Sequence, residues 1–173
     1  MFFFWAYNTS SYYYLLELLK KLELPASVQT IGERAFESCW LLEEIVIPQG
    51  VTKLSSGLFF NCKKLTSITI PDSVTKIDSC AFADSDLASI ILPKGIKEIS
   101  ESLFARCHYL TEITIPEGVT SIGGSAFDSC DSLTDVYYTG TEEQWNAIEK
   151  GERWFSSPFD VEVVCSDGVV SLT

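Results

Sequence analysis

Apolar side chains recur along the chain with a period of about 23 residues, and each copy of the pattern opens with a proline. The opening prolines, which follow one another after 23, 23, 22 and 23 residues, are Pro25, Pro48, Pro71, Pro93 and Pro116. Each copy reads, with small variations, Pro-x-x-Val-x-x-Ile-x(4)-Phe-x-x-Cys-x-x-Leu-x-x-Ile-x-Ile. A fixed repeat of this length predicts a solenoid, in which every repeat forms one coil that packs on its neighbours.

Each copy predicts one clear strand, a turn and two less regular pieces. In residues 65–70, β-branched side chains alternate with small polar ones, which indicates a strand with one buried face. The next proline follows this strand directly, where its missing N–H and fixed φ end strand pairing. A second short extended piece is expected at residues 51–54 and their equivalents. The stretch around the phenylalanine then returns across the back as a loop or a short helical turn.

Stacking of equivalent coils places like strands about 4.8 Å apart in a parallel sheet on one face. We therefore expect a β-rich α/β solenoid with two columns of apolar side chains inside. The aromatic column is Phe36, Phe59, Phe82, Phe104 and Phe127, and the aliphatic column is Leu42, Leu65, Leu87, Leu110 and Leu133. The third copy is one residue short between Phe82 and Leu87, which predicts an irregularity near residues 84–86.

Both ends of the chain predict covers for the open ends of the core. Residues 13–25 align with residues 36–48, so residues 1–24 are expected to form an N-terminal cap with a degenerate repeat, whose leucine-rich sequence also suits a helix. Residues 25–138 hold five repeats, and residues 139–173 form a C-terminal cap. This cap begins with a capping box at residues 141–144 and has a final strand at residues 161–165. Its apolar covers are Trp145, Ile148 and Trp154. Without caps a solenoid exposes apolar ends and a sheet edge.

Charge and hydropathy exclude two classes of partner. Twenty-four acidic and twelve basic residues give a net charge of −12, so nucleic acid is not expected as a partner. Membrane insertion is not expected either, because no apolar run reaches the eighteen or so residues of a membrane span. The N-terminal apolar run is short and the first basic residue is Lys20, so this chain shows no secretory signal.

Four of the six cysteines occupy one position of the repeat, three residues after the phenylalanine. They are Cys39, Cys62, Cys107 and Cys130, and the third copy has Ser85 there. A position that takes Cys or Ser in every copy favours a small buried side chain, and we expect stacked free thiols. A disulfide among them is the alternative. Cys80 and Cys165 lie outside this column, and no metal-binding spacing is present.

Residues for catalysis are few, and we expect neither enzymatic activity nor a cofactor. The single histidine, His108, follows Cys107 but takes a variable repeat position, so we expect it to face solvent. Nucleophile-elbow, phosphate-loop and zinc-protease motifs are missing from the sequence. The acidic cluster at residues 84–86 lacks the glycine and glutamate of a calcium loop and predicts a solvated surface. Residues 8–10 form a glycosylation sequon, and the aromatic residues 2–7 are expected to pack in the cap or an interface.

The unit from proline through Val, Ile, Phe, Cys and Leu to the final Ile-x-Ile resembles that of the BspA-like class of leucine-rich repeat proteins. The ending Tyr138-Thr139-Gly140-Thr141 with Gln144-Trp145 is similar to the segment that often closes such arrays. The resemblance implies a right-handed leucine-rich repeat array with capped ends. It also implies a secreted or cell-surface protein, bacterial or protist, with a role in adhesion to host proteins. A cytoplasmic location stays open because this chain shows no secretory signal.

We therefore predict a non-catalytic protein-binding module that uses the exposed face of its repeat sheet. In the strand pattern Leu-x-x-Ile-x-Ile the named residues point inward, so the alternate residues form two outward columns. The first column is Glu44, Ser67, Ser89, Glu112 and Asp135, and the second is Val46, Thr69, Ile91, Thr114 and Tyr137. These residues are also good strand formers, which is the plainer explanation for them. The alternative function is a structural spacer or self-assembly unit of a larger surface protein. Self-association through the caps is a further expected contact.

Overall fold

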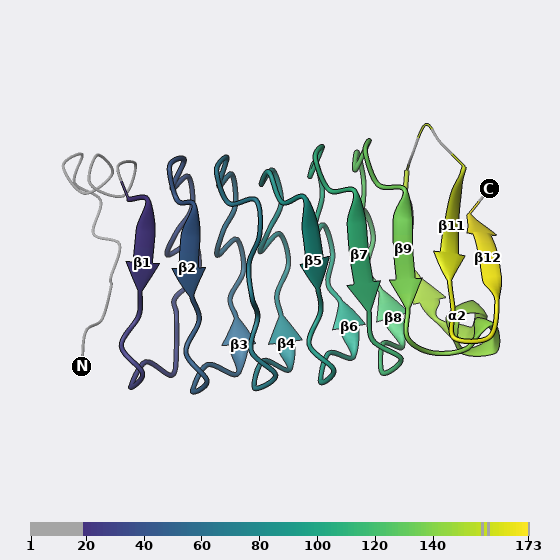
Figure 1. Ribbon diagram of the computed structural model, residues 1–173, viewed down its shortest axis with the longest axis horizontal. Coiled ribbons are helices and arrows are strands. Elements are labelled where there is room, and N and C mark those ends of the chain that lie inside the picture. The colour runs from purple at the N-terminus through teal and green to yellow at the C-terminus, as the bar shows by residue number, and fades with distance from the viewer. Residues whose placement is uncertain (1–18, 157, 159, 173) are drawn as a thin grey trace.

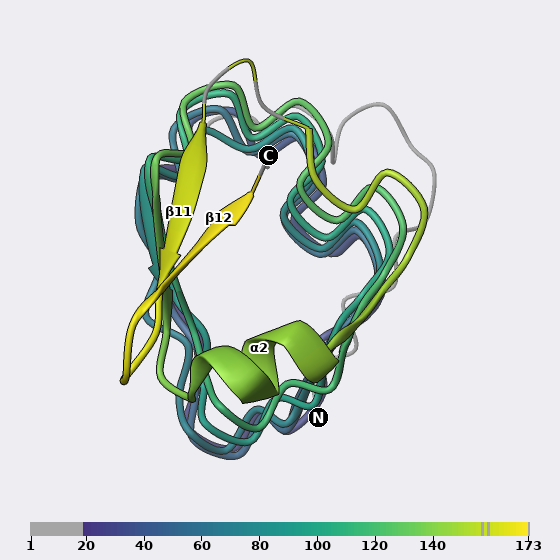
Figure 2. The same ribbon diagram turned by 90° about the vertical axis from the view of Figure 1, so that its right-hand side faces the viewer.

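The computed structural model describes residues 19–156, 158 and 160–172 of the 173-residue chain. Its coils stand side by side along the long axis of the molecule, and the strands of one face cross that axis (Figure 1). Each coil hydrogen-bonds to the next at repeat-equivalent positions, so neighbouring coils superpose when viewed along the stack (Figure 2). The predicted β-rich solenoid with a parallel sheet is confirmed.

The main sheet is formed by the strands at the end of each copy. Its five-stranded part has the order β12-β11-β9-β7-β5, and a separate pair joins β1 to β2. The pairing is parallel except between β11 and β12, and the register keeps equivalent residues opposite each other, as in Ser89↔Glu112 and Glu112↔Asp135. The bounds are β1 Lys21–Glu23, β2 Glu44–Val46, β5 Ser89–Ile91, β7 Glu112–Ile115, β9 Asp135–Tyr138, β11 Val161–Val164 and β12 Val169–Leu172.

The strand predicted at residues 65–70 is wrong. This segment runs between β2 and β5 without ladder pairing, which divides the main sheet into two parts. One backbone hydrogen bond, from the N–H of Ala88 to the carbonyl of Thr66 (2.9 Å), ties it to the next coil. Ile68, predicted to point inward, is only half-buried. We attribute the gap to the adjoining third coil. This coil has one residue fewer between its phenylalanine and its strand, which changes how the strand lies against residues 65–70.

A second row of very short parallel strands follows the turns, and the sequence did not predict that these pieces pair. They form a three-stranded sheet in the order β10-β8-β6 and a separate pair, β3-β4. Their bounds are β3 Lys53–Leu54, β4 Lys76–Ile77, β6 Glu98–Ile99, β8 Ser121–Ile122 and β10 Glu149–Lys150. Strand pairing therefore joins coils on a second face as well, with a break between β4 and β6. The turn between the two rows begins at the proline, whose carbonyl accepts the N–H of the third residue after it at 2.9–3.1 Å.

The back of each coil is a sequence of tight turns centred on the phenylalanine. Residues two before and two after it have positive φ in all five repeats, and nine of these ten residues are not glycine. Around Phe104, for example, Ser102 and Arg106 have φ of 53° and 62°. Their N–H groups and that of Phe104 donate to carbonyls of the next coil at 2.7–3.0 Å. The left-handed residues thus turn the chain so that its amides point along the stack.

The predicted aromatic and aliphatic columns are confirmed. Successive phenylalanine rings stack with centroids 5.4–5.7 Å apart and planes within 16° of parallel. All five rings are buried, as are the five leucines. Offset-stacked rings at this spacing add to the free energy gained by burial. The two columns form the centre of the core along its full length.

The C-terminal segment both closes the core and continues the repeat register. Phe155 is bridged in parallel to Phe127, and Arg153, two residues earlier, has the same positive φ as its equivalents. The helix α2 (Glu142–Ala147) begins at Thr141 with the predicted capping box. It buries Trp145, which packs edge-on against Tyr138 and Trp154. α2 and β12 lie over one end of the stack in Figure 2.

At the N-terminal end, β1 pairs with β2 in the register of the repeats, Lys21 opposite Glu44. The end of the degenerate copy therefore forms a strand. Residues 13–18 of that copy, the aromatic residues 2–7 and the sequon at residues 8–10 lie outside the described residues.

Truncation of Phe82 to alanine removes a fully buried ring from the middle of the aromatic column. We expect Phe82→Ala to lower the free energy of unfolding by about 3–5 kcal/mol, measured by urea denaturation. Tyr109→Ala, at a ring that is 62% exposed, is the control and should change it by about 0.5 kcal/mol or less. Equal effects of the two substitutions would contradict the placement of Phe82.

Candidate functional site

The two predicted columns lie on the outer side of the main sheet. Nine of their ten residues are exposed, and Thr114 is half-buried. The apolar members stand out, because Ile91 is 69% exposed, Val46 50% and Tyr137 38%. The inward residues between them, such as Ile90 and Ile113, are buried. The alternation fixes which side chains reach solvent, while their predicted role in binding stays a prediction.

Strand register brings the C-terminal members of each column together. Ser89, Glu112 and Asp135 are opposite one another on β5, β7 and β9, as are Ile91, Thr114 and Tyr137. The columns are less regular at Ser67 and Thr69, because residues 65–70 do not join the ladder. The N-terminal members Glu44 and Val46 belong to the separate β1-β2 pair. The continuous part of the face therefore begins at β5.

The face extends beyond the residues predicted from the sequence. Glu162 and Val164 of β11 are opposite Asp135 and Tyr137, and Val169 of β12 is opposite Val164. Val164 is 42% exposed and Val169 49%. The alternation in residues 161–165 was the available signal, since that strand was predicted without being aligned to the columns. Exposed apolar side chains thus occur on four of the five strands, with the half-buried Thr114 between them on β7.

The charge on the face differs between its two ends. At the N-terminal end Lys21 Nζ lies 3.0 Å from Glu44 Oε1. At the C-terminal end the carboxylates of Glu112, Asp135 and Glu162 are in none of the ion pairs of the described residues. Three adjacent carboxylates without a cation make this end strongly negative.

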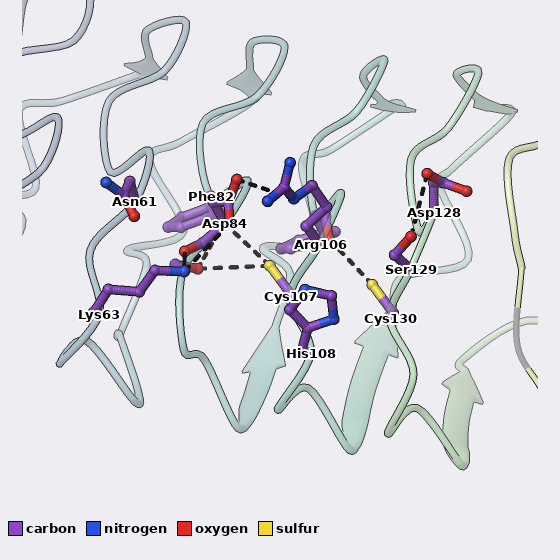
Figure 3. A network of polar contacts seen from close by, with 12 residues as sticks. Asn61, Lys63, Phe82, Asp84, Arg106, Cys107, His108, Asp128, Ser129 and Cys130 are labelled. Atoms are coloured by element: carbon purple, nitrogen blue, oxygen red, sulfur yellow. Dashed lines mark hydrogen bonds and ion pairs between the residues drawn. The ribbon is translucent and has the colours of Figure 1, made fainter.

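The acidic cluster on the back of the third coil is not the solvated surface expected from the sequence. Lys63 Nζ lies 3.3 Å from Asp84 Oδ1, and Arg106 Nε lies 3.2 Å from Asp84 Oδ2 (Figure 3). Lys63 Nζ also lies 3.8 Å from Asp86 Oδ1. Lys63 also donates to the Asp84 carbonyl at 2.6 Å. Asp84 retains only 16% of its side-chain exposure. These charges link three successive coils, and their acids are already paired.

The repeat cysteines are buried, and the described cysteines are free thiols. Cys62, Cys107 and Cys130 each donate at 3.1 Å to the phenylalanine carbonyl of the preceding coil, whereas Ser85 donates to Phe82 of its own coil. This change of acceptor is a local irregularity of the kind predicted for the short third copy. Burial raises the pKa of Cys39 to about 11 and that of Cys107 to about 12. These thiols are therefore protonated at neutral pH.

Cys107 and His108 do not form a catalytic pair. Cys107 Sγ points inward to the Phe82 carbonyl (Figure 3). His108 is 46% exposed, and its Nδ1 lies 2.9 Å from Asp131 Oδ2. The predicted solvent-facing position of His108 is confirmed. Within the described part of the chain, His, Cys, Asp and Glu side chains form no cluster that could hold a metal ion.

A pocket of about 440 Å³ lies at the C-terminal end, between α2 and β12. It is lined by Trp145, Asn146, Lys150, Trp154, Phe155, Ser156, Val170, Ser171 and Leu172. The Lys150 ammonium already donates to the Trp145 and Ile148 carbonyls at 2.9 and 3.1 Å. The pocket therefore brings together aromatic cap residues rather than a set of converging reactive groups.

Comparison with known proteins points to one family. A sequence profile described as BspA type leucine rich repeat region matches residues 8–134 in six copies. Among solved structures, a leucine rich cell surface protein from Faecalibacterium prausnitzii A2-165 is 34% identical over 75% of this chain, with a TM-score of 0.68. The match covers 35% of that protein, so this chain spans about a third of its length. No curated protein matches the sequence.

Two further structures share the fold. A leucine-rich repeat protein from Bacteroides ovatus ATCC 8483 is 26% identical over 70% of this chain and 39% of its own, with a TM-score of 0.56. A leucine rich repeat protein from T. pallidum is 22% identical over 85% of this chain and 73% of its own, with a TM-score of 0.63. In the described part of this chain, the helices lack the length and apolar character that a membrane crossing requires.

Thiol labelling tests the burial of the repeat cysteines. With a water-soluble thiol reagent at pH 7, we expect Cys39, Cys62, Cys107 and Cys130 to react slowly in the native protein and fully in urea, because burial limits both access and ionisation. Cys80, which is half-buried, serves as the internal comparison and should react first. Peptide mapping by mass spectrometry assigns the sites. Rapid native modification of all four repeat cysteines would contradict their placement.

Proposed function

The chain belongs to the BspA type leucine-rich repeat proteins, and from this membership we propose that it is a non-catalytic protein-binding module. Its binding surface is the outer face of the sheet formed by β5, β7, β9, β11 and β12. The partner is a protein at a host or cell surface, and the contact is adhesive. The proposal concerns only the part of such proteins that this chain spans, which is about a third of the F. prausnitzii protein.

The apolar stripe on the outer sheet face is the observation that carries this proposal. Ile91, Tyr137, Val164 and Val169 are each 38–69% exposed on neighbouring strands, with Thr114 between them. Exposed apolar side chains that adjoin one another mark interaction sites more often than isolated ones do. Backbone hydrogen bonds hold these strands, so the side chains meet a partner with little loss of backbone entropy. Tyr137 supplies an aromatic group of the kind that anchors interfaces.

A surface location agrees with the name of the F. prausnitzii structure, a leucine rich cell surface protein that is 34% identical. The net charge of −12 favours solubility of the domain and disfavours binding to anionic partners such as nucleic acid. Secretion or display at the cell surface is therefore part of the proposal.

A structural role is the second candidate, and one observation favours it. β12 is the outermost strand of its sheet and, among the described residues, pairs only with β11. An open edge of this kind can pair with another chain. In that case the array is a spacer or assembly unit, and the protein self-associates end to end. Light scattering after size-exclusion chromatography separates the two candidates, because binding to a foreign protein requires no such association.

The double variant Ile91→Lys with Tyr137→Lys tests the binding face. We expect it to lose the proteins that the wild-type domain captures from host-cell surface extract, because two charges replace the apolar anchors. Quantitative mass spectrometry measures the loss, and the melting curve should stay unchanged since both side chains are exposed.

The matched control is Trp40→Lys with Tyr109→Lys, which changes two aromatic side chains outside the sheet that are 47% and 62% exposed. It should retain capture. If both double variants keep the same partners, the binding face lies elsewhere and the proposal fails.

A further inference from the structure

The C-terminal half of the sheet face combines an apolar stripe with a row of carboxylates. The apolar stripe consists of Ile91, Thr114, Tyr137, Val164 and Val169. The carboxylate row consists of Glu112, Asp135 and Glu162, each two residues before a member of the apolar stripe on the same strand. Alternate residues on a strand are about 6.6–6.8 Å apart, so the two rows run side by side across the strands.

The carboxylate row lowers the stability of the folded chain when no partner is bound. Glu112 is opposite Asp135, and Asp135 is opposite Glu162, so like charges face each other across two strand pairs. Such pairs are destabilising. None of the described ion pairs relieves them, although the same column contains the Lys21–Glu44 pair at its other end. A cation supplied from outside would remove this repulsion.

The spacing of the row indicates what form the cations take. Successive carboxylates follow the strand spacing of about 4.8 Å along the stack, which Figure 1 shows as the long axis. An α-helix laid along that axis presents one side chain per turn, every 5.4 Å or so. Over three carboxylates the mismatch is about 1 Å, which the flexible stem of a lysine or arginine accommodates. Leucine-sized groups in the adjacent helix row then meet the apolar stripe.

We propose that the carboxylate row and the apolar stripe together bind a basic amphipathic helix of a partner protein. This inference rests on the proposed function and assigns the chemistry of its partner. The helix lies along the solenoid axis, with its lysines or arginines on Glu112, Asp135 and Glu162 and its apolar row on Ile91, Tyr137 and Val164. Charge complementarity speeds the encounter, and the apolar contacts slow dissociation.

The test uses a synthetic peptide of about 18 residues, long enough to form a helix, with one row of lysines beside one row of leucines. Its binding to the domain is measured by fluorescence anisotropy. We expect saturable one-to-one binding with a gain of helical circular dichroism. A second peptide with the lysines replaced by glutamine should bind about tenfold more weakly.

Two triple variants with the same net charge locate the site. The variant Glu112→Gln, Asp135→Asn, Glu162→Gln should weaken binding of the lysine peptide about tenfold. It should also melt no lower than the wild type, because like-charge repulsion has been removed. The control variant Glu98→Gln, Glu101→Gln, Glu149→Gln removes three exposed carboxylates away from the main sheet and should change binding by about twofold or less.

Equal losses in the two triple variants would overturn the inference, since binding would then follow net charge alone. An unchanged affinity in the carboxylate-row variant would also overturn it. In either case the proposed function is judged separately: if capture of a surface protein still depends on Ile91 and Tyr137, the face binds a partner of different chemistry. If capture does not depend on them, the proposed function fails as well.

Discussion

The structure depends on a constant spacing between neighbouring coils along the stack. The contacts on the back of each coil set this spacing. Three backbone hydrogen bonds around each of the first four phenylalanines, and two around Phe127, join one coil to the next, while the rings stack at 5.4–5.7 Å. The geometry requires positive φ on both sides of the phenylalanine, which is unfavourable by about 1–2 kcal/mol for most residues. Burial of the aromatic and aliphatic columns offsets this strain, and the strands of both sheets then fall into register.

Acidic side chains on the two faces of the solenoid differ in their ion pairing. On the back, Asp84 forms ion pairs with Lys63 of the preceding coil and Arg106 of the following coil, so its charge helps to hold the coils together. On the front, the fixed register places Glu112, Asp135 and Glu162 next to one another without a cation among the described ion pairs. The array thus retains repulsion on the face that also exposes Ile91 and Tyr137. Because the strands hold these carboxylates in place, a cationic partner that neutralises them would remove the repulsion.

The features that repeat in the sequence were the ones that could be predicted from it. The period identified the phenylalanine, leucine and cysteine columns directly, and the capping box at Thr141 located α2. Residues 65–70 have a strand pattern but no ladder, and we attribute the lost pairing to the shorter neighbouring coil, which the pattern of the segment itself does not record. The two-residue strands of the second row are too short to give a period. Glu162 and Val164 were missed as members of the face because their copy is interrupted by α2, which hides its register.

Methyl-detected NMR of the domain, titrated with a protein that it captures, tests the binding face most directly. The account predicts chemical-shift changes at the methyl groups of Ile91, Val164 and Val169, which lie on three strands of one face. The methyl groups of Ile77 and Ile99, in the second row of strands, should stay unchanged. Shifts confined to Ile77, Ile99 or the α2 end, with Ile91 and Val164 unaffected, would contradict it.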